Sequence, residues 1–449
     1  MKKKFAITSL LFISLILSSI GLRFAQGAAF PGNILTNTSN ASKAPWTIET
    51  VDSANDTGLA VSVAIDPEDG TIYVSYYDST NDDLRSAKYV GSGGNCGVGN
   101  SWVCRTLDQN ADVGKDSSIA VNPQSVNVGI AYRGDGDLKY ATGCYAPACL
   151  WSYSTIDAGY TYPQVVYKGY SPSLVFHSDG TPVITYQTSE NHLMVAQYTG
   201  SNGDCGEGTA AGKWQCDSVN TGYLITKYPS LALDSEEDWH ITYYNPANDS
   251  LMYTYWSGGN QVDLEILSPQ AGKYPSIAID INNDDVQHIA HYDETNHSLE
   301  YAKYVGSGGN CGYFFNSYTW QCDEIDDMGP DPASPKGLDI AVDNAGYPII
   351  AYGANYTLKI ARPVAALGSR ISGNCGPMNP THTWKCETID IARNSGQSGQ
   401  ANYASIAVNS AGLATIAYYG DFSTTTNDDG DLKVAYQRLH LYLPLITKK

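Results

Sequence analysis

A four-part repeat recurs along this chain and limits its possible folds more than any other feature. Its clearest copy, Tyr274 to Tyr304, contains three short runs of β-branched and aromatic residues separated by the polar turns INNDD and DETNHS. Runs of this kind, bounded by Asn, Asp and Ser, are typical of strands joined by hairpins. TWQCDEID, which follows shortly after, supplies a fourth strand. Each repeat therefore predicts a four-stranded antiparallel sheet.

The four segments, termed strands A to D, can be aligned along most of the chain. Strand A centres on a small residue between aliphatic ones, as in VSVAID from Val61 and PSIAID from Pro275. Strand B follows it, as in IYVSYYD and HIAHYDE. In strand C one leucine position is filled in seven copies: Leu84, Leu138, Leu193, Leu251, Leu299, Leu358 and Leu432.

The seventh D strand is found at the other end of the sequence. Only six D strands follow a C strand, but Trp46–Asp52 (WTIETVD) matches the D strand WKCETID. A first strand that completes the last sheet would close a ring and remove both exposed sheet edges. Because single repeats cannot bury both faces of a sheet, the sheets must pack on one another. We expect an all-β, seven-bladed β-propeller over residues 44–438, with an open stack of sheets as the alternative.

The two ends of the chain do not follow the repeat. Lysines 2–4 precede a largely apolar run, and Ala25-Gln26-Gly27 offers small residues for cleavage, which predicts a signal peptide over 1–27. An uncleaved membrane anchor is the alternative. Residues 28–43 are expected to be a linker and 439–449 a C-terminal tail. The protein should be secreted, extracellular or attached to the cell surface, with no transmembrane segment after cleavage.

The ten cysteines fall into five close pairs in the links between strands C and D. Pairing between neighbours is favoured because other pairings would cross between blades, and an exported chain meets an oxidising compartment. Zinc is not expected, because no pair has the spacing of metal ligands. The predicted disulfides are Cys96–Cys104, Cys144–Cys149, Cys205–Cys216, Cys311–Cys322 and Cys375–Cys386.

The balance of charges narrows the classes of partner. The formal charge is −20, and nucleic acid is therefore not an expected partner, because phosphate contacts need basic patches. The acidic segments DINNDD and TNDDGD resemble calcium loops only in composition, so calcium is possible but unsupported and no cofactor is predicted. The chain is expected to be a monomer.

Four of the C–D links resemble degenerate Asp-boxes, the turns of sialidase-type propeller blades. They read SGGNCG, SNGDCG, SGGNCG and SGNCG, at 92–97, 201–206, 307–312 and 372–376, each followed by a tryptophan. The blades are also similar to those of secreted bacterial repeat proteins. The resemblance implies a propeller fold; for a sialidase it would also imply three clamping arginines and a Tyr–Glu pair. That constellation cannot be assembled here, and no catalytic residue is predicted.

The ligand is expected on the face formed by the B–C and D–A links, the predicted ligand face. Tyrosines there recur beside carboxylates and amides, a combination that suits the C–H faces and hydroxyl edges of sugars. The predicted function is non-catalytic binding, most plainly of glycan, with a carbohydrate-active hydrolase or lyase and an adhesive module that binds surface protein as alternatives. The candidate residues are Tyr77, Asp78, Tyr228, Tyr244, Asn245, Tyr274, His291, Tyr292, Asp293 and Tyr403.

His291 is a candidate because it interrupts a pattern. Six blades carry tyrosine at its position in strand B, and a histidine buried in the core is the plainer interpretation. For the individual tyrosines, stacking of one blade on the next is likewise the plainer interpretation.

Overall fold

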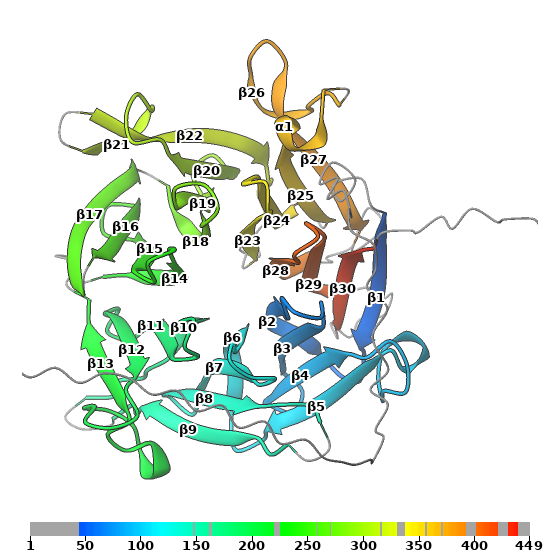
Figure 1. The fold of residues 1–449 in the computed structure, drawn as a ribbon, viewed down its shortest axis with the longest axis vertical. Helices are drawn as coiled ribbons and strands as arrows, with labels where there is room; N and C mark the ends of the chain where they lie inside the picture. Colours follow the sequence, from blue (N-terminus) through cyan, green and yellow to red (C-terminus); the bar gives the residue numbers. More distant parts are fainter. Residues whose placement is uncertain are drawn as a thin grey trace, which may run out of the picture. The chain divides into compact units, whose positions relative to one another are not determined.

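The computed structural model describes residues 45–438, apart from 147–148, 161–163, 220–224, 258, 270, 315–316, 330–336, 355–356, 370, 392–400 and 421–429. The expected signal peptide (1–27), the expected linker (28–43), the first residue of the expected propeller and the expected C-terminal tail (439–449) lie outside these residues. Seven antiparallel sheets are arranged around a central channel, which confirms the predicted seven-bladed propeller (Figure 1). Among the described residues, no helix is both long and apolar enough to cross a membrane.

Each of the first four blades has four strands in the order A, B, C, D from the channel outward. Blade 1 comprises β2 (Thr57–Ile65), β3 (Ile72–Asp78), β4 (Asp83–Tyr89) and β5 (Trp102–Asp108). Blade 2 comprises β6 (Val113–Val121), β7 (Val128–Gly134), β8 (Asp137–Gly143) and β9 (Ser152–Asp157). Blade 3 comprises β10 (Tyr170–Phe176), β11 (Pro182–Gln187), β12 (Leu193–Tyr198) and β13 (Trp214–Ser218). Blade 4 comprises β14 (Lys227–Leu233), β15 (Trp239–Asn245), β16 (Ser250–Ser257) and β17 (Asn260–Pro269).

Blades 5 and 6 each carry a fifth, outermost strand that the repeat did not predict. Blade 5 comprises β18 (Lys273–Asp280), β19 (Val286–Asp293), β20 (Ser298–Tyr304), β22 (Ser317–Asp327) and the extra β21 (Cys311–Phe314). Blade 6 comprises β23 (Leu338–Val342), β24 (Pro348–Ala354), β25 (Thr357–Pro363), β27 (His382–Ile391) and the extra β26 (Cys375–Met378). Short helical turns lie at η2 (Val98–Asn100), η3 (Gly208–Ala210) and α1 (Val364–Leu367).

Blade 7 closes the ring as the sequence predicts. It comprises β28 (Ala401–Val408), β29 (Ala414–Gly420), β30 (Asp431–Gln437) and the N-terminal β1 (Trp46–Asp52). Strand β1 pairs antiparallel with β30, with Asp52 opposite Leu432 and Ile48 opposite Ala435. The first and last described strands therefore lie side by side, blue and red in Figure 1.

The apolar core lies between blades rather than within one sheet. In one cluster Val63 and Val74 of blade 1 pack with Leu432 and Val434 of blade 7. Alternate side chains of each sheet thus bury their apolar surface against the next blade, which supplies the main driving force for closing the ring.

A belt of hydrogen bonds runs around the channel and joins every blade to the next. One side-chain oxygen in each A strand accepts the backbone N–H of the following blade, at 2.9–3.4 Å. Six of the seven acceptors are serines and the seventh is Asp339. In ring order they are Ser62, Ser118, Ser173, Ser230, Ser276, Asp339 and Ser405.

A second set of contacts joins neighbouring blades farther from the channel. An aspartate at or next to the end of strand D in one blade accepts a hydrogen bond from the strand-B tyrosine of the next, at 2.5–2.8 Å in four cases. A lysine or arginine lies beside each carboxylate, as in Arg85–Asp52 at 3.0 Å. The pairs are Tyr76–Asp52, Tyr132–Asp108, Tyr186–Asp157, Tyr352–Asp326 and Tyr418–Asp390.

The five predicted disulfides are all present and lie within single blades. Beside three of them an asparagine fixes the same link: Asn374, for example, accepts the N–H of Cys386 at 2.8 Å and donates to its carbonyl at 3.0 Å. The following glycine, Gly376, has φ 72°, and a Cβ there would lie 2.5 Å from the Trp384 ring. The tryptophan thus packs directly against the turn, which explains why only glycine fits.

Candidate functional site

Most of the predicted site residues in the B–C turns are buried and stabilise those turns. Asp78 accepts the N–H groups of Thr80 and Asn81, both at 3.1 Å, and Asp293 plays the same role in its own turn. The carbonyl oxygen of Asn245 accepts the N–H of Ala247 at 3.0 Å. These three side chains fix local backbone, because short carboxylates and amides mimic the hydrogen bonds of a turn.

The B–C tyrosines are buried as well, and each hydroxyl bonds to a residue of the turn. Tyr77 donates to Asp82 and, at 3.1 Å, to Asp112. Tyr244 donates to Asp249 at 2.7 Å, and the Tyr292 hydroxyl lies 3.0 Å from a His297 ring nitrogen. Burial raises the pKa of Tyr77 and Tyr244, so both remain neutral phenols.

The remaining three predicted tyrosines come together at the mouth of the channel. Tyr228, Tyr274 and Tyr403 line a shallow depression of about 250 Å³, together with serines of the hydrogen-bonded belt. The ring centroids of Tyr228 and Tyr274 are 4.3 Å apart. All three residues have left-handed backbone, with φ between 51° and 56°. A bulky residue adopts this conformation only where its surroundings enforce it, which marks the mouth as a strained surface.

Asp339 stands on the wall of the same depression and was missed by the sequence analysis. Its carboxylate accepts Ser276 Oγ at 2.6 Å, Ser405 Oγ at 3.1 Å and the N–H of Ile406 at 2.9 Å. Burial raises its pKa, although these hydrogen bonds favour the charged form. The signal was available, because six copies of strand A carry serine at this position and one carries aspartate.

His291 is buried, with 1% of its surface exposed, at the strand-B position where the other blades have tyrosine. Within the described part of the chain, neither of its ring nitrogens has a hydrogen-bond partner. Burial lowers its pKa to about 3, so the imidazole is neutral. Its cross-strand neighbour is Glu300, where four other blades carry Lys or Arg. Burial raises the pKa of this carboxyl to about 7.

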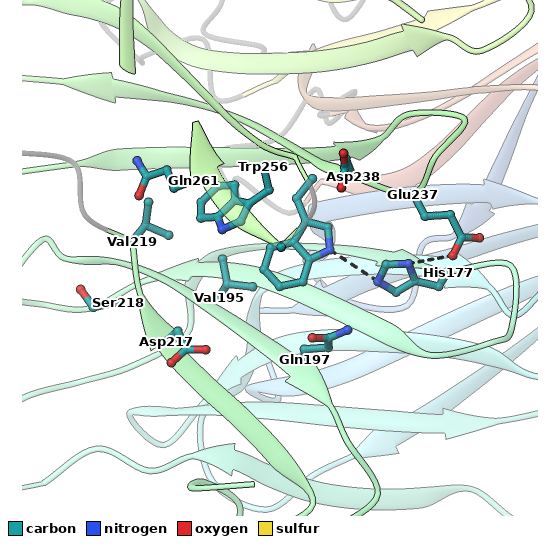
Figure 2. Close-up of a pocket in the computed structure, with 12 residues that line it drawn as sticks. His177, Val195, Gln197, Asp217, Ser218, Val219, Glu237, Asp238, Trp256 and Gln261 are labelled. Atoms are coloured by element: carbon teal, nitrogen blue, oxygen red, sulfur yellow. Dashed lines mark hydrogen bonds and ion pairs between the residues drawn. The ribbon is translucent and has the colours of Figure 1, made fainter. Parts of the chain in front are cut away.

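A larger cavity lies between blades 3 and 4, toward the face opposite the predicted ligand face. It encloses about 610 Å³, and we call it the tryptophan cavity after Trp239 and Trp256, which line it (Figure 2). Trp239 begins β15 and Trp256 lies near the end of β16, so neighbouring strands of one blade present both rings. The ring centroids are 5.6 Å apart, with planes inclined by 51°. The two indoles therefore form an aromatic corner, and both are only partly buried.

A hydrogen-bonded chain holds one wall of this corner. The Trp239 indole N–H donates to Nε2 of His177 at 3.4 Å. That nitrogen is then the acceptor, so Nδ1 carries the proton and donates to the Glu237 carboxylate at 3.1 Å. Glu237 also accepts the N–H of Ser178 at 2.6 Å. Hydrogen bonding by the Ser178 side chain, followed by this backbone N–H, lowers the pKa of Glu237. His177 is contributed by blade 3, so the chain links the two walls of the cavity (Figure 2).

Polar side chains complete the rim. Gln197 and Gln261 offer amides, and Asp217 and Asp238 offer carboxylates. Among the described residues that line the cavity there is no lysine or arginine. Aromatic faces beside amides and carboxylates bind polar rings through C–H contacts and hydrogen bonds.

The sequence contained a signal for this site that the analysis did not use. Six of the eight tryptophans belong to strand D or immediately precede it, at the same point of the repeat. The other two, Trp239 and Trp256, are both in blade 4, which also lacks a cysteine pair. Both also pack against the apolar cluster between blades 3 and 4. Because the repeat does not require tryptophan at either position, they are candidates for function.

Comparison of sequences finds no relative of this chain, and comparison of structures finds distant similarities. No family model matches the sequence, and no curated protein is recognisably similar to it. Among solved structures, AofleA from Arthrobotrys oligospora is similar at 12% identity and a TM-score of 0.45, over 77% of this chain and 90% of that one. The Aleuria aurantia lectin, in complex with Fucα1-6GlcNAc, is similar at 12% identity and 0.43, over 75% and 98%. The polysaccharide lyase Uly1 is similar at 10% identity and 0.45, over 84% and 90%.

Proposed function

We propose that this protein is a non-catalytic glycan-binding propeller and that the tryptophan cavity is its principal sugar site. The observation that carries the proposal is the aromatic corner of Trp239 and Trp256 within a cavity of about 610 Å³. A cavity of this size accommodates a sugar of one or two rings. One indole can stack on the C–H face of the sugar while Gln197 and Gln261 bond to its hydroxyls.

The channel mouth is proposed as a second, shallower glycan surface. Tyr228, Tyr274 and Tyr403 present phenols there on strained backbone, and strain of this kind is concentrated at functional sites. The buried candidates of the B–C turns (Tyr77, Asp78, Tyr244, Asn245, Tyr292 and Asp293) would support that surface from below.

We further propose that the protein works outside the cell, either secreted or attached to its surface. Five disulfides and the predicted signal peptide support this proposal, because such bridges persist in oxidising compartments. Recovery of the mature chain from culture medium or from the cell surface, beginning after Gly27, is the expected result. A chain that stays in the cytoplasm with reduced cysteines would contradict it.

The glycan-binding proposal is tested on a glycan array, followed by titration of the hits by calorimetry and by tryptophan fluorescence. Trp256→Ala should abolish binding at the cavity while Tyr228→Ala leaves it intact. Tyr160→Ala, at an aromatic residue 45% exposed elsewhere, is the matched control. If Trp256→Ala binds like the wild type, the cavity is not the site.

The same titrations separate the alternatives. Cleavage of a bound glycan, detected as new reducing ends, unsaturated products or free sialic acid, would replace the binding function by a hydrolase, lyase or sialidase-type activity. An array without any hit would refute glycan binding and leave an adhesive module for surface proteins.

A further inference from the structure

We infer that the tryptophan cavity selects sugars that carry a free ammonium group, such as oligomers of glucosamine, over N-acetylated or anionic sugars. This inference rests on the proposed glycan-binding function and specifies the ligand of the same site. It follows from the combination of charge and aromatic surface in one cavity, which neither feature would support alone.

The charges around the cavity have one sign. Glu237 and Asp238 come from the A–B turn of blade 4, and Asp217 comes from strand β13 of blade 3, so carboxylates approach from both walls. Lysine and arginine do not occur among its described lining residues. Glu237 is held by Ser178 and His177. Asp217 is exposed and, among the residues that the structure describes, accepts a single hydrogen bond from Gln215 Nε2, at 3.1 Å, and Asp238 is partly exposed. These two carboxylates are therefore the best placed to meet a ligand.

The aromatic corner adds a second source of attraction for a cation. The face of an indole carries the negative part of the ring quadrupole, and tryptophan is the side chain that binds cations most strongly in this way. Trp239 is already fixed by its hydrogen bond to His177, so little freedom is lost when a ligand stacks on it. An ammonium group that lies between the indole rings and the carboxylates is attracted by both.

Other sugars lack this match. An N-acetylated sugar offers a neutral amide where the cavity presents negative charge, so the carboxylates remain solvated by water alone. A uronic acid or a sialic acid would bring a further carboxylate toward Asp217 and Asp238 and be repelled. The expected preference for an ammonium over an N-acetyl group is about tenfold. It comes mainly from the contact between the ammonium group and a carboxylate, because a charge-assisted hydrogen bond outweighs a cation–π contact with partly exposed indoles.

The test compares tetramers of glucosamine, N-acetylglucosamine and galacturonic acid by calorimetry with the full mature protein at mildly acidic pH. We expect the glucosamine tetramer to bind about tenfold more tightly than its acetylated counterpart, with an affinity that falls as salt rises. Asp238→Asn combined with Asp217→Asn should weaken the glucosamine tetramer about tenfold more than the acetylated tetramer, and so remove the preference. Glu68→Gln, at an exposed acid in blade 1, is the matched control.

The outcomes distinguish this inference from the function on which it rests. If both amino-sugar tetramers bind equally, or the preference survives the double substitution, the inference is wrong while glycan binding stands. If no sugar of any class binds, both proposals fail. Loss of the preference in the double variant and its persistence in Glu68→Gln would support the inference.

Discussion

Glu300 provides the sharpest quantitative test of the structure, because a buried acid occupies a position where the repeat elsewhere carries a base. In blades 1, 2, 6 and 7 the residue after the strand-C leucine is Arg or Lys, and it lies beside the tyrosine of strand B. In blade 5 the tyrosine is replaced by His291 and the base by Glu300. Among the described residues no opposite charge compensates the carboxylate, which accepts only the Ser298 hydroxyl at 2.9 Å, and the exposed Glu324 lies across from it on the next strand.

The magnitude follows from the pKa of this carboxyl. Burial raises it from 4.5 to about 7 in the folded protein. Each pKa unit corresponds to about 1.4 kcal/mol, so ionised Glu300 destabilises the fold by about 3 kcal/mol. Since the folded state binds this proton more tightly than the unfolded state, stability is highest below the unfolded pKa. This extra stability is lost as the pH rises from the unfolded pKa of 4.5 to the folded pKa of about 7, and none of it remains above that pH.

Glu300→Gln removes the titration and keeps the shape. The variant should match the wild type near pH 4 and be more stable by about 3 kcal/mol near pH 8. The assay is urea denaturation followed by fluorescence across this range, with Glu68→Gln as the exposed control. If the difference between variant and wild type is the same at both pH values, or is larger in acid, the assigned burial of Glu300 is wrong.

Three further predictions follow from the structure. Asp339→Ala should lower the free energy of unfolding by about 2 kcal/mol in urea denaturation, because charge-assisted hydrogen bonds to two blades are lost. Asp339→Ser, which restores the residue of the other blades, should lower it by less than half as much. Equal losses in the two variants would contradict the role of the belt. His177→Ala should weaken sugar binding severalfold in fluorescence titration, because it releases Trp239 and also removes a hydrogen bond to Glu237. The melting temperature should change little, because His177 is only partly buried; an unchanged affinity would refute its role at the site. Removal of residues 1–52 should abolish a single cooperative melting transition in calorimetry, because β1 completes blade 7, and an intact transition would mean that closure is dispensable.

The parts of the fold that repeat could be predicted from the sequence. The recurring strand-C leucines and the match of Trp46–Asp52 to a D strand were sufficient to place blade 7 and its closure, because period and alternation are visible in one chain. The same regularity gave all five disulfides. The fifth strands β21 and β26 were not predicted, because they lie in links whose sequences differ between blades.

Contacts between blades were harder to predict from the sequence. The repeat shows that six blades carry tyrosine at one position of strand B, but it does not show that five of these tyrosines donate to an aspartate of the preceding blade. A linear repeat does not reveal which blade a side chain faces. The tryptophan cavity was missed for a related reason. Trp239 and Trp256 do not occupy the tryptophan position of the repeat, so a consensus of the seven copies does not include them.

The distribution of disulfides has a consequence for how the ring comes apart. Blades 1, 2, 3, 5 and 6 each contain a disulfide, whereas blade 7, where β1 meets β30, is held only by non-covalent contacts: backbone pairing, packing and side-chain bonds such as that from Tyr436 to Glu49. The junction that closes the ring therefore has no disulfide to hold it. When it opens, the freed β1 of one molecule can complete the last blade of another, so concentrated, gently warmed samples should yield strand-exchanged dimers before they unfold.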